Sequence, residues 1–580
     1  MNLPAIHHIN WLEYREALPD GRVRIRIRAA RGDWDEVTLL FQGIYNPDRF
    51  VYKFKETPME HVARDGLHDW FQADFLPEDP RPCYMFRLEK VGETIYFDQD
   101  GVKTAADFEC MPFGIVPFPF AYVWPPEGKP GWARGAAGYQ IFPDRFRRGS
   151  PSQSGLEPWT GGRVSNAVRY GGDLKGILEA VPYIKGLGAE IVYLTPIFLS
   201  DTAHRYNVHD YYLLDPMLGS LEDLKALADL LHDSGMHLVL DGVFNHCGTR
   251  FAPFADVRRR GKGSPFFSWF FLDESKIGYQ AFAFEQRMPK LNLRDPKAAE
   301  YFLQVGRYWV REAGIDGWRL DVSPEVWPEF WRRFRCAIKE ENPEAILIAE
   351  CWDDSREWVS VGDMFDGTMH YILSRAVWRF FALDEISLES FDAAVNRAMM
   401  LYPSGANAMQ WTFLSSHDTP RFLTRAGKRL ERLEMAAFFQ FTAPGVPIVY
   451  YGDELGMEGK GDPDCRRPMR WDLVDGNPTL ALYRRLAEVR KRFSALREGD
   501  FRTVEVGQDG LYAYLRTGDS PVLCALCTGE SSGTSELVLP SQFQGITKLF
   551  DWMGKNECPV RDGRVSLVLK PGRGYILSRF

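Results

Sequence analysis

Long apolar runs are missing from this sequence of 580 residues, and no stretch approaches the roughly 20 consecutive apolar residues that a membrane-spanning helix needs. An excess of positive charge is missing too, because 70 Lys and Arg stand against 79 Asp and Glu, giving a formal net charge of -9. This balance argues against nucleic acid or an anionic membrane as the main partner. We therefore expect a globular protein whose partner is neither nucleic acid nor membrane.

Cysteine is scarce, with nine residues scattered along the chain. The odd number and the wide spacing argue against a disulfide framework. Cys524 and Cys527 form a close pair, but no second pair completes a zinc site, so we interpret them as core residues. The chain opens MNLPAIHHIN, without a basic and apolar signal segment. Free thiols and a cytoplasmic location are therefore expected.

The length of the chain predicts several domains, because it exceeds what one hydrophobic core supports. Residues 1–127 carry short alternating runs such as RVRIRIRAA (22–30), separated by turn residues, which is typical of a β-sandwich. A segment rich in Pro and Gly, 123–135, is the expected linker. Alternation returns in 497–580, which predicts a C-terminal β-sandwich and leaves 128–496 as the central domain.

The central domain alternates apolar strands with amphipathic helical stretches, such as 221–235 and 298–314. The strands are expected at 138–142, 191–196, 237–244, 317–322, 345–351, 365–371, 409–418 and 447–454. Strands joined by helical crossovers in this way predict an α/β fold, a (β/α)8 TIM barrel. Their near-continuous apolar character fits a sheet that is buried on both faces.

The spacing of the acids indicates an insertion after the third barrel strand. Asp321 and Glu350 are 29 residues apart, about one strand and helix, whereas Asp241 and Asp321 are 80 residues apart. The extra residues, about 246–295, predict a small subdomain over the barrel mouth. Its aromatic run PFFSWFF (265–271) is either the core of the insert or a substrate contact.

Acidic side chains end several predicted strands, where the active sites of such barrels lie. Arg319 and Asp321 project from one face of strand four because they stand two residues apart. Glu350 ends strand five, Asp418 ends strand seven, and we interpret Asp241 as a buried supporting acid. Cleaving a glycosidic bond needs one ionised and one protonated carboxyl, and no metal-ligand spacing such as HExxH accompanies these acids. A set of structural ion pairs is the alternative.

Four ordered motifs resemble the signature regions of the α-amylase superfamily, glycoside hydrolase family 13, whose members retain anomeric configuration. They are DGVFNH (241–246), GWRLDV (317–322), AEC (349–351) and SSHD (415–418). MPKLN (288–292) resembles the further signature of the neopullulanase, cyclomaltodextrinase and maltogenic amylase branch. YQIFPDRFRRG and YYGDELGMEGKGDPDCRRPMRWD are similar to that branch as well. The resemblance extends over nearly the whole chain, since that branch also carries a β-sandwich at each end.

The resemblance implies catalytic roles for three carboxylates. Asp321 would be the nucleophile that forms a β-glycosyl intermediate, and Glu350 the general acid and then the base. Asp418 would hold the sugar hydroxyls at the bond-cleaving subsite and favour a distorted ring.

The resemblance also implies substrate-binding roles for Arg319, His246, His417, Tyr206, Trp352, Asp462 and Arg466. Arg319 would keep Asp321 ionised, while the two histidines donate hydrogen bonds to the sugar. Tyr206 is the expected ring beneath that sugar, with plain packing as the alternative. Asp462 and Arg466 would grip the next sugar outward.

Some positions depart from the pattern of the branch. VSPE (322–325) stands where relatives commonly read VANE, and Asp353 where they often have His, so fine specificity is left open. Some relatives are expected to bind calcium through an Asn-Gly-Asp loop, but the loop here reads RRGSPSQSG (147–155). We therefore predict no metal and no required cofactor, with a structural calcium as an alternative that this loop does not support. His204 and His209 are predicted to be non-catalytic.

The leading hypothesis is a hydrolase of α-1,4 bonds in cyclodextrins, pullulan or short maltodextrins, with α-1,6 bonds as further candidates. Two alternatives are enzymes: a transglycosylase or isomerase, and a hydrolase of another α-linked cyclic or branched glucan. A third is a non-catalytic glucan-binding scaffold. By the resemblance, the N-terminal sandwich packs over a neighbouring subunit's barrel mouth, so a homodimer is expected.

Overall fold

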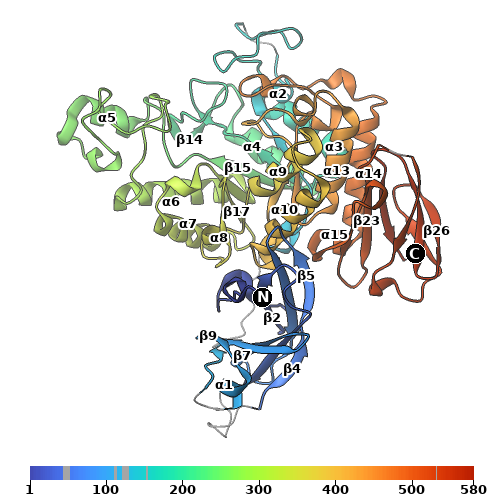
Figure 1. The fold of residues 1–580 in the computed structure, drawn as a ribbon. Coiled ribbons are helices and arrows are strands. Elements are labelled where there is room, and N and C mark those ends of the chain that lie inside the picture. The colour runs from blue at the N-terminus through green and yellow to red at the C-terminus, as the bar shows by residue number, and fades with distance from the viewer. Residues whose placement is uncertain (44–52, 110–113, 120–129, 152–153, 531, 580) are drawn as a thin grey trace.

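The computed structural model describes residues 1–43, 53–109, 114–119, 130–151, 154–530 and 532–579. An N-terminal β domain extends from one end of a central barrel, and a C-terminal β domain packs against the barrel's side (Figure 1). The predicted linker lies largely outside the described residues, and its described part contains a short 3-10 turn, Gly131–Ala133.

The N-terminal domain is a sandwich of two antiparallel sheets around an apolar core. One sheet has the order β1-β2-β6-β5 and the other β4-β3-β7-β8-β9, with β10 paired to β7. The strands are β1 (Arg15–Ala17), β2 (Val23–Ala30), β3 (Glu36–Gly43), β4 (Lys55–Pro58), β5 (Glu60–Arg64), β6 (His68–Phe75), β7 (Pro82–Lys90), β8 (Glu93–Asp98), β9 (Gly101–Lys103) and β10 (Phe118–Pro119). This confirms the predicted sandwich.

Strand β2 shows why alternation produces this arrangement. Val23, Ile25 and Ile27 point into the core of the sandwich and are fully buried. The intervening Arg24 is also buried, but on the other face, where it pairs with Asp500 of the C-terminal domain at 3.0 Å. Strand β2 therefore carries a core face and an interdomain face.

The central domain is a closed parallel barrel, as predicted. The order of the strands is β18-β17-β16-β15-β12-β11-β20-β19, and a parallel bridge between Met369 and Trp411 closes the ring. The strands are β11 (Gly138–Ile141), β12 (Ile191–Leu194), β15 (His237–Gly242), β16 (Gly317–Leu320), β17 (Ile346–Ala349), β18 (Gly367–Thr368), β19 (Trp411–Phe413) and β20 (Val446–Tyr450). Each of them falls within one residue of a predicted segment or inside it.

Helices cover the outside of the barrel (Figure 1). The main ones are α3 (Leu174–Leu187), α4 (Leu221–Asp233), α6 (Pro296–Ala313), α7 (Pro328–Glu341), α9 (Tyr371–Val377), α10 (Leu388–Met400), α13 (Leu430–Thr442) and α14 (Pro478–Arg492). Local sequence sets their ends: Ser220 and Asp223 form a capping box at the start of α4, and Gly314 closes α6 in a left-handed conformation.

The insert after β15 contains α5 (Ala252–Arg260) and lies to one side of the barrel (Figure 1). Its aromatic run packs inward: Trp269 and Phe270 are buried, and Phe270 meets Phe254 of α5 edge to face at 5.0 Å. Of the two interpretations of PFFSWFF, the core of the insert is therefore correct for these residues.

The C-terminal domain is an antiparallel sheet with the order β21-β22-β23-β28-β25-β26-β27-β24, folded around one apolar core. Its strands are β21 (Phe501–Val506), β22 (Leu511–Arg516), β23 (Val522–Cys527), β24 (Gly533–Val538), β25 (Lys548–Asp551), β26 (Asn556–Arg561), β27 (Arg564–Leu569) and β28 (Gly574–Ser578). Cys524 and Cys527 are buried free thiols in β23, which confirms that they are core residues.

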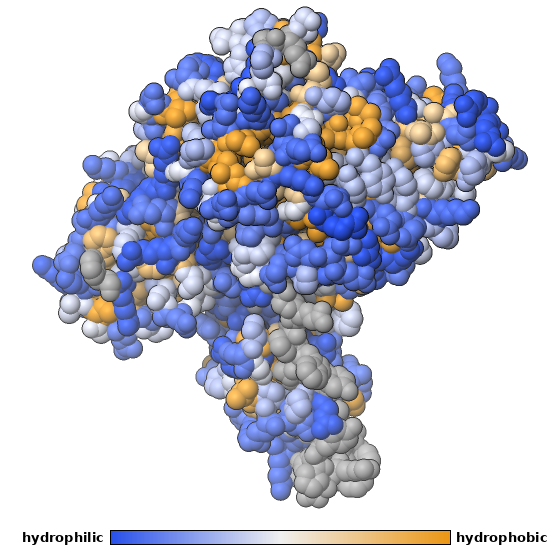
Figure 2. Space-filling model, turned by 180° about the vertical axis from the view of Figure 1, so that it is seen from behind, coloured by the Kyte–Doolittle hydropathy of each residue, from blue (hydrophilic) through white to orange (hydrophobic). Residues whose placement is uncertain are grey.

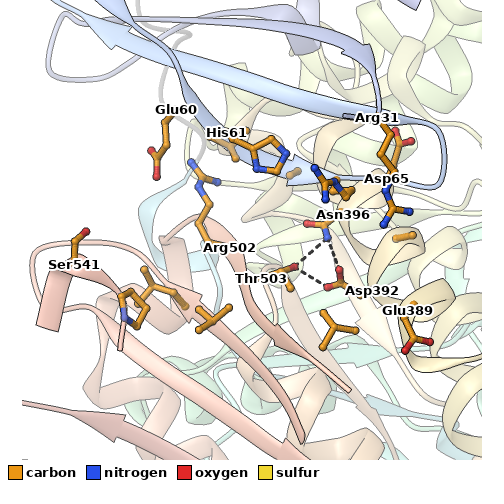
Figure 3. A pocket seen from close by; sticks show the side chains of 18 of the residues that line it. Arg31, Glu60, His61, Asp65, Glu389, Asp392, Asn396, Arg502, Thr503 and Ser541 are labelled. Carbon is orange, nitrogen blue, oxygen red and sulfur yellow. Dashed lines mark hydrogen bonds between the residues drawn. The ribbon is translucent and has the colours of Figure 1, made fainter. Parts of the chain in front are cut away.

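All three domains meet at α10. A cavity of about 640 Å³ lies between β5, α10 and β21 (Figure 3). At its floor, Asp392 and Asn396 of α10 form hydrogen bonds with Thr503 of β21. Strands from both flanking domains thus pack against one barrel helix.

The surface is largely polar. Hydrophilic side chains cover most of the face shown in Figure 2, with apolar ones in small clusters among them. Within the described ranges, no helix has the length and apolar character required to cross a bilayer.

Candidate active site

The side chain of Arg319, which projects from β16, is the centre of the candidate site and is fully buried. Its Nη1 donates to Asp321 Oδ1 at 2.8 Å and to Asp241 Oδ1 at 3.0 Å. Its Nη2 lies 2.9 Å from Glu350 Oε2. Because β15, β16 and β17 are adjacent parallel strands, their ends bring three distant acids around one guanidinium.

The electrostatics of this cluster favour retention of a proton. Burial raises the pKa of Asp321 well above its usual value, the Glu350 carboxylate raises it further, and Arg319 opposes both. Burial also raises the pKa of Asp241, to about 6. Full ionisation would place three negative charges against one positive charge in a buried cluster. At least one carboxyl is therefore expected to keep its proton near neutral pH. Arg319 alone does not hold the pKa of Asp321 at its usual value, contrary to the expectation that it keeps this acid ionised.

Both oxygens of Glu350 are oriented by the segments around them. The backbone N–H of Val322 donates to Oε2 at 2.9 Å, and the Trp352 indole donates to Oε1 at 3.0 Å. Val322 has a left-handed backbone, with φ 46° and ψ 43°, a strained conformation for a β-branched residue. Trp352 stacks on Tyr371 at 4.1 Å and is 43% exposed. The acid is thus held between a strained turn and a stacked indole.

A hydrogen-bonded chain connects His417 with Asp241. Gln140 Nε2 donates to His417 Nδ1 at 2.7 Å, so this ring carries its proton on Nε2. That Nε2 faces the Tyr206 hydroxyl and lies 3.0 Å from Asp418 Oδ2. Tyr206 donates in turn to Asp241 Oδ2 at 3.0 Å. Burial, together with two nearby arginines, lowers the pKa of His417 well below its usual value, so the ring is neutral.

The insert supplies a second wall. His246 stacks on Phe282 at 4.8 Å, and its Nε2 has no hydrogen-bond partner in the part of the chain that the structure describes. Burial, with a smaller contribution from the nearby Lys290 charge, lowers the pKa of His246 to about 3. A neutral ring with an unpartnered nitrogen can bind a sugar hydroxyl.

A polar clamp around Arg466 forms another wall of the site. Arg466 Nη1 lies 2.8 Å from Asp462 Oδ1, and its Nη2 donates to Asp418 Oδ1 at 3.2 Å. Asn166 bridges this pair, because its Oδ1 accepts from Arg466 at 3.0 Å while its Nδ2 donates to Asp462 at 3.1 Å. The predicted pair thus has a third member.

These walls enclose a cavity of about 780 Å³ at the barrel mouth. Eight of the predicted residues line it: Asp321, Glu350, Asp418, His246, Tyr206, Trp352, Asp462 and Arg466. Arg319 and His417 are fully buried behind this wall and act on it through the groups they bind. The ring of Tyr206 lies parallel to that of His417, at 5.5 Å and 5°. His204, predicted to be non-catalytic, also lines the cavity.

Several lining residues escaped prediction: Asn166, Phe282, Glu285, Arg287, Asp354 and Trp358. Phe282 lies six residues before Met288, the start of the MPKLN motif, and that proximity could have indicated it. Asn166 stands in a loop without a distinguishing pattern, and it reaches the site by a contact across 300 residues.

The loop 147–155 does not fit a calcium ion. Its sequence contains no carboxylate or Asn, and calcium prefers several such oxygens. The nearby Asp173 is already engaged, because its carboxylate accepts from the backbone N–H groups of Gly149, Ser150 and Gly176. Residues 152 and 153 of the loop lie outside the described ranges.

A (β/α)8 barrel with paired carboxylates, a third acid and aromatic rings around one mouth cavity defines the class as a glycoside hydrolase. Residues 140–499 match the model of the alpha amylase catalytic domain, and residues 1–121 match that of the alpha amylase N-terminal ig-like domain. The chain therefore belongs to the α-amylase family, as the motifs predicted.

Named enzymes are similar to most or all of the chain. It is 38% identical over 600 residues to neopullulanase 2 of Thermoactinomyces vulgaris, covering 100% of this chain and 99% of that protein. The solved structure of a cyclomaltodextrinase matches with a TM-score of 0.92 and 32% identity over 100% of both chains. A cyclic α-maltosyl-(1→6)-maltose hydrolase from Arthrobacter globiformis matches with a TM-score of 0.71 and 33% identity over 78% of this chain and 100% of that one.

Proposed function

We propose that this enzyme hydrolyses α-1,4-glucosidic bonds, and α-1,6 bonds as well, in cyclodextrins, pullulan or short maltodextrins, with retention of configuration. The observation that carries the proposal is the pair Asp321 and Glu350, which lie 2.8 and 2.9 Å from the two terminal nitrogens of Arg319. Sharing one guanidinium keeps the two carboxyls side by side, as a retaining mechanism requires. The names of the relatives above support the same substrates.

In the first step, a carboxylate oxygen of Asp321 attacks the anomeric carbon of the sugar. The glycosidic C–O bond breaks, and the proton on Glu350 passes to the leaving oxygen. This leaves a β-glycosyl ester on Asp321 and a carboxylate on Glu350. Asp418, beside neutral His417, binds hydroxyls of the reacting sugar.

In the second step, Glu350 accepts a proton from water, and the resulting nucleophile attacks the anomeric carbon. The ester bond to Asp321 breaks, and the product leaves with its original α configuration. If a sugar hydroxyl takes the place of water, the same step makes a longer or rearranged product. That outcome is the alternative function, transglycosylation, favoured by the exposed indole of Trp352 beside the acid, which offers an acceptor sugar a stacking surface.

A chromatographic time course with γ-cyclodextrin, pullulan, soluble starch and maltotriose tests the proposal. Consumption of the small or cyclic sugars much faster than starch is expected. If none of the four is consumed, the proposed substrates are wrong, and cyclic branched glucans such as cyclic maltosyl-maltose are tested next. Early products longer than the substrate would indicate transglycosylation.

The substitution Asp321→Asn tests the nucleophile. We expect kcat to fall by at least about a thousandfold, because no carboxylate remains to form the ester. The circular dichroism spectrum is expected to stay unchanged, since Asn has nearly the same shape. Normal activity in the variant would refute the assignment.

Catalysis is proposed to need no metal or cofactor, since the steps above use only side chains and water. Dialysis against EDTA should leave kcat unchanged, whereas a loss that calcium restores would contradict this. We also propose a cytoplasmic location, supported by the eight free cysteines among the described residues. Cell fractionation tests it.

The enzyme is proposed to be a homodimer in which the N-terminal domain of each chain narrows the barrel mouth of the other. The first residues support this, because Met1, Leu3, Ile9 and Trp11 are all more than a third exposed. All four lie within the first eleven residues, and contiguous exposed apolar patches mark protein interfaces.

A further inference from the structure

Two histidines and an aspartate come together at the end of the barrel opposite the active site. His232 lies in the last turn of α4, His237 is the first residue of β15, and Asp316 directly precedes β16. One nitrogen of each ring and one carboxylate oxygen lie within 4.8 Å of one another. From this juxtaposition we infer a binding site for a divalent transition metal of the zinc class.

The distances fit such an ion. Asp316 Oδ2 lies 2.8 Å from His232 Nε2, and Asp316 Oδ1 lies 3.2 Å from His237 Nδ1. Zinc binds imidazole nitrogen and carboxylate oxygen at about 2.0–2.2 Å in a tetrahedron, so neighbouring ligand atoms stand about 3.3 Å apart. Small rotations of these side chains would therefore place an ion between them, with a fourth position open to water.

The ring of His237 provides an independent observation. Its Nδ1 is shielded from solvent and makes no aligned hydrogen bond with any group of the described chain, although Asp316 is near. Trp132 stacks on this ring at 3.8 Å and 21°, and its own indole N–H donates to the Glu344 carbonyl at 3.0 Å. The ring is thus held in place with a buried nitrogen that faces the cluster.

The backbone around the cluster is also well anchored. Asp316 N donates to the Leu238 carbonyl at 2.8 Å, and the Asp316 carboxylate accepts from Leu238 N at 2.7 Å. The turn between the two histidines is closed by a hydrogen bond from Gly235 N to the His232 carbonyl at 2.8 Å. The binding groups therefore lose little freedom when an ion arrives.

The donor set selects the class of ion. Two imidazoles and one carboxylate suit zinc and neighbouring transition metals, whereas calcium and magnesium prefer oxygen ligands alone. The side chains of His232, His237 and Asp316 are 38%, 29% and 13% exposed, so an ion can reach them from solvent. Bound there, it would join α4, β15 and β16, beside the segment that leads from the N-terminal domain into the barrel.

Calorimetric titration of the metal-depleted, full-length enzyme with Zn²⁺ tests this site. We expect one zinc per chain in the wild type. His237→Gln and His232→Ala should each weaken zinc binding at least tenfold. Losing a group that only orients a metal ligand already costs about tenfold in affinity, and losing a ligand should cost no less. His61→Ala is the matched control, because His61 pairs with Asp69 at 3.0 Å outside any such cluster, and it should bind zinc normally.

Thermal unfolding gives a second readout. Zinc should raise the Tm of the wild type and of His61→Ala, because it binds the folded chain, and should not raise that of His237→Gln. Hydrolysis by His237→Gln should be unchanged, since the cluster lies away from the mouth. The inference is overturned if the wild type binds no zinc, or if both cluster variants keep wild-type affinity. Then the three side chains form a hydrogen-bonded group without an ion.

Discussion

At the scale of single residues, the site depends on how one guanidinium is shared. Arg319 contacts Asp241, Asp321 and Glu350. Because Arg319 is fully buried, solvent screens its charge only weakly. Each acid changes the protonation of the others, because their charges interact through a low dielectric. The ionisation of the nucleophile is therefore set by the whole cluster.

The pH dependence of activity should report this coupling. Asp241 is one of the charges that raise the pKa of Asp321, and Asp321 must be ionised to attack. In Asp241→Asn that negative charge is gone, so the pKa of Asp321 falls. The acidic limb of the kcat/KM profile should move to lower pH.

A matched control is Asp453→Asn, which also removes a buried acid that pairs with an arginine, Arg421, at 2.9 Å. Asp453 is not among the groups with the largest effects on the pKa of Asp321. The acidic limb of the kcat/KM profile of Asp453→Asn should stay where it is in the wild type. An unmoved limb in Asp241→Asn would contradict the coupling.

At the scale of elements, the loop after β17 connects catalysis with the N-terminal domain. Glu13 of that domain is nearly buried and lies 2.8 Å from Arg356 Nη1. Arg356 also binds Asp354, which lines the cavity on the same loop as Glu350 and Trp352. The N-terminal domain thus supports the loop that carries the acid.

The substitution Glu13→Gln should lower kcat/KM on γ-cyclodextrin severalfold. The expected loss is well short of the roughly hundredfold cost of displacing a catalytic group by 1 Å, because Arg356 keeps its contacts with Asp354. Asp20→Asn, in the exposed pair with Arg22, serves as the control and should have no effect. Unchanged kinetics in Glu13→Gln would show that the loop holds its position alone.

The elements of the barrel could be predicted because their signals are local. Short apolar runs located each strand, and the ordered motifs located Asp321, Glu350 and Asp418 at predicted strand ends. The predicted segment 409–418 is longer than β19, since its SSHD part leaves the sheet to form the mouth. Pairings such as Glu13 with Arg356, 343 residues apart, leave no periodic trace, and neither does the left-handed turn at Val322.

At the scale of the whole molecule, the exposed apolar residues at the start of the chain bear on assembly. Trp11 is 52% exposed, and Leu67, at a turn of the same domain, is 73% exposed. If the dimer forms through the first residues, Trp11 lies in the interface and Leu67 lies outside it. The two positions therefore distinguish an interface residue from an ordinary exposed one.

Sedimentation at micromolar concentration should give the mass of two chains for the wild type and for Leu67→Asp. Trp11→Asp should dissociate, because losing an interface hot spot costs at least about 2 kcal/mol, roughly thirtyfold in Kd. A monomeric wild type would rule out the proposed dimer.

The meeting of three domains on α10 has a consequence for how this chain can be recombined. Strands β5 and β21 both pack against that helix. Thr503 of β21 donates a hydrogen bond to Asp392 of α10 across the boundary between the C-terminal domain and the barrel. A chimaera that took either flanking domain from a relative would set a foreign strand against this helix. Chimaeras that fold should therefore keep β5, α10 and β21 from one parent. The contacts of α10, more than the position of the linker, decide where two sequences can be joined.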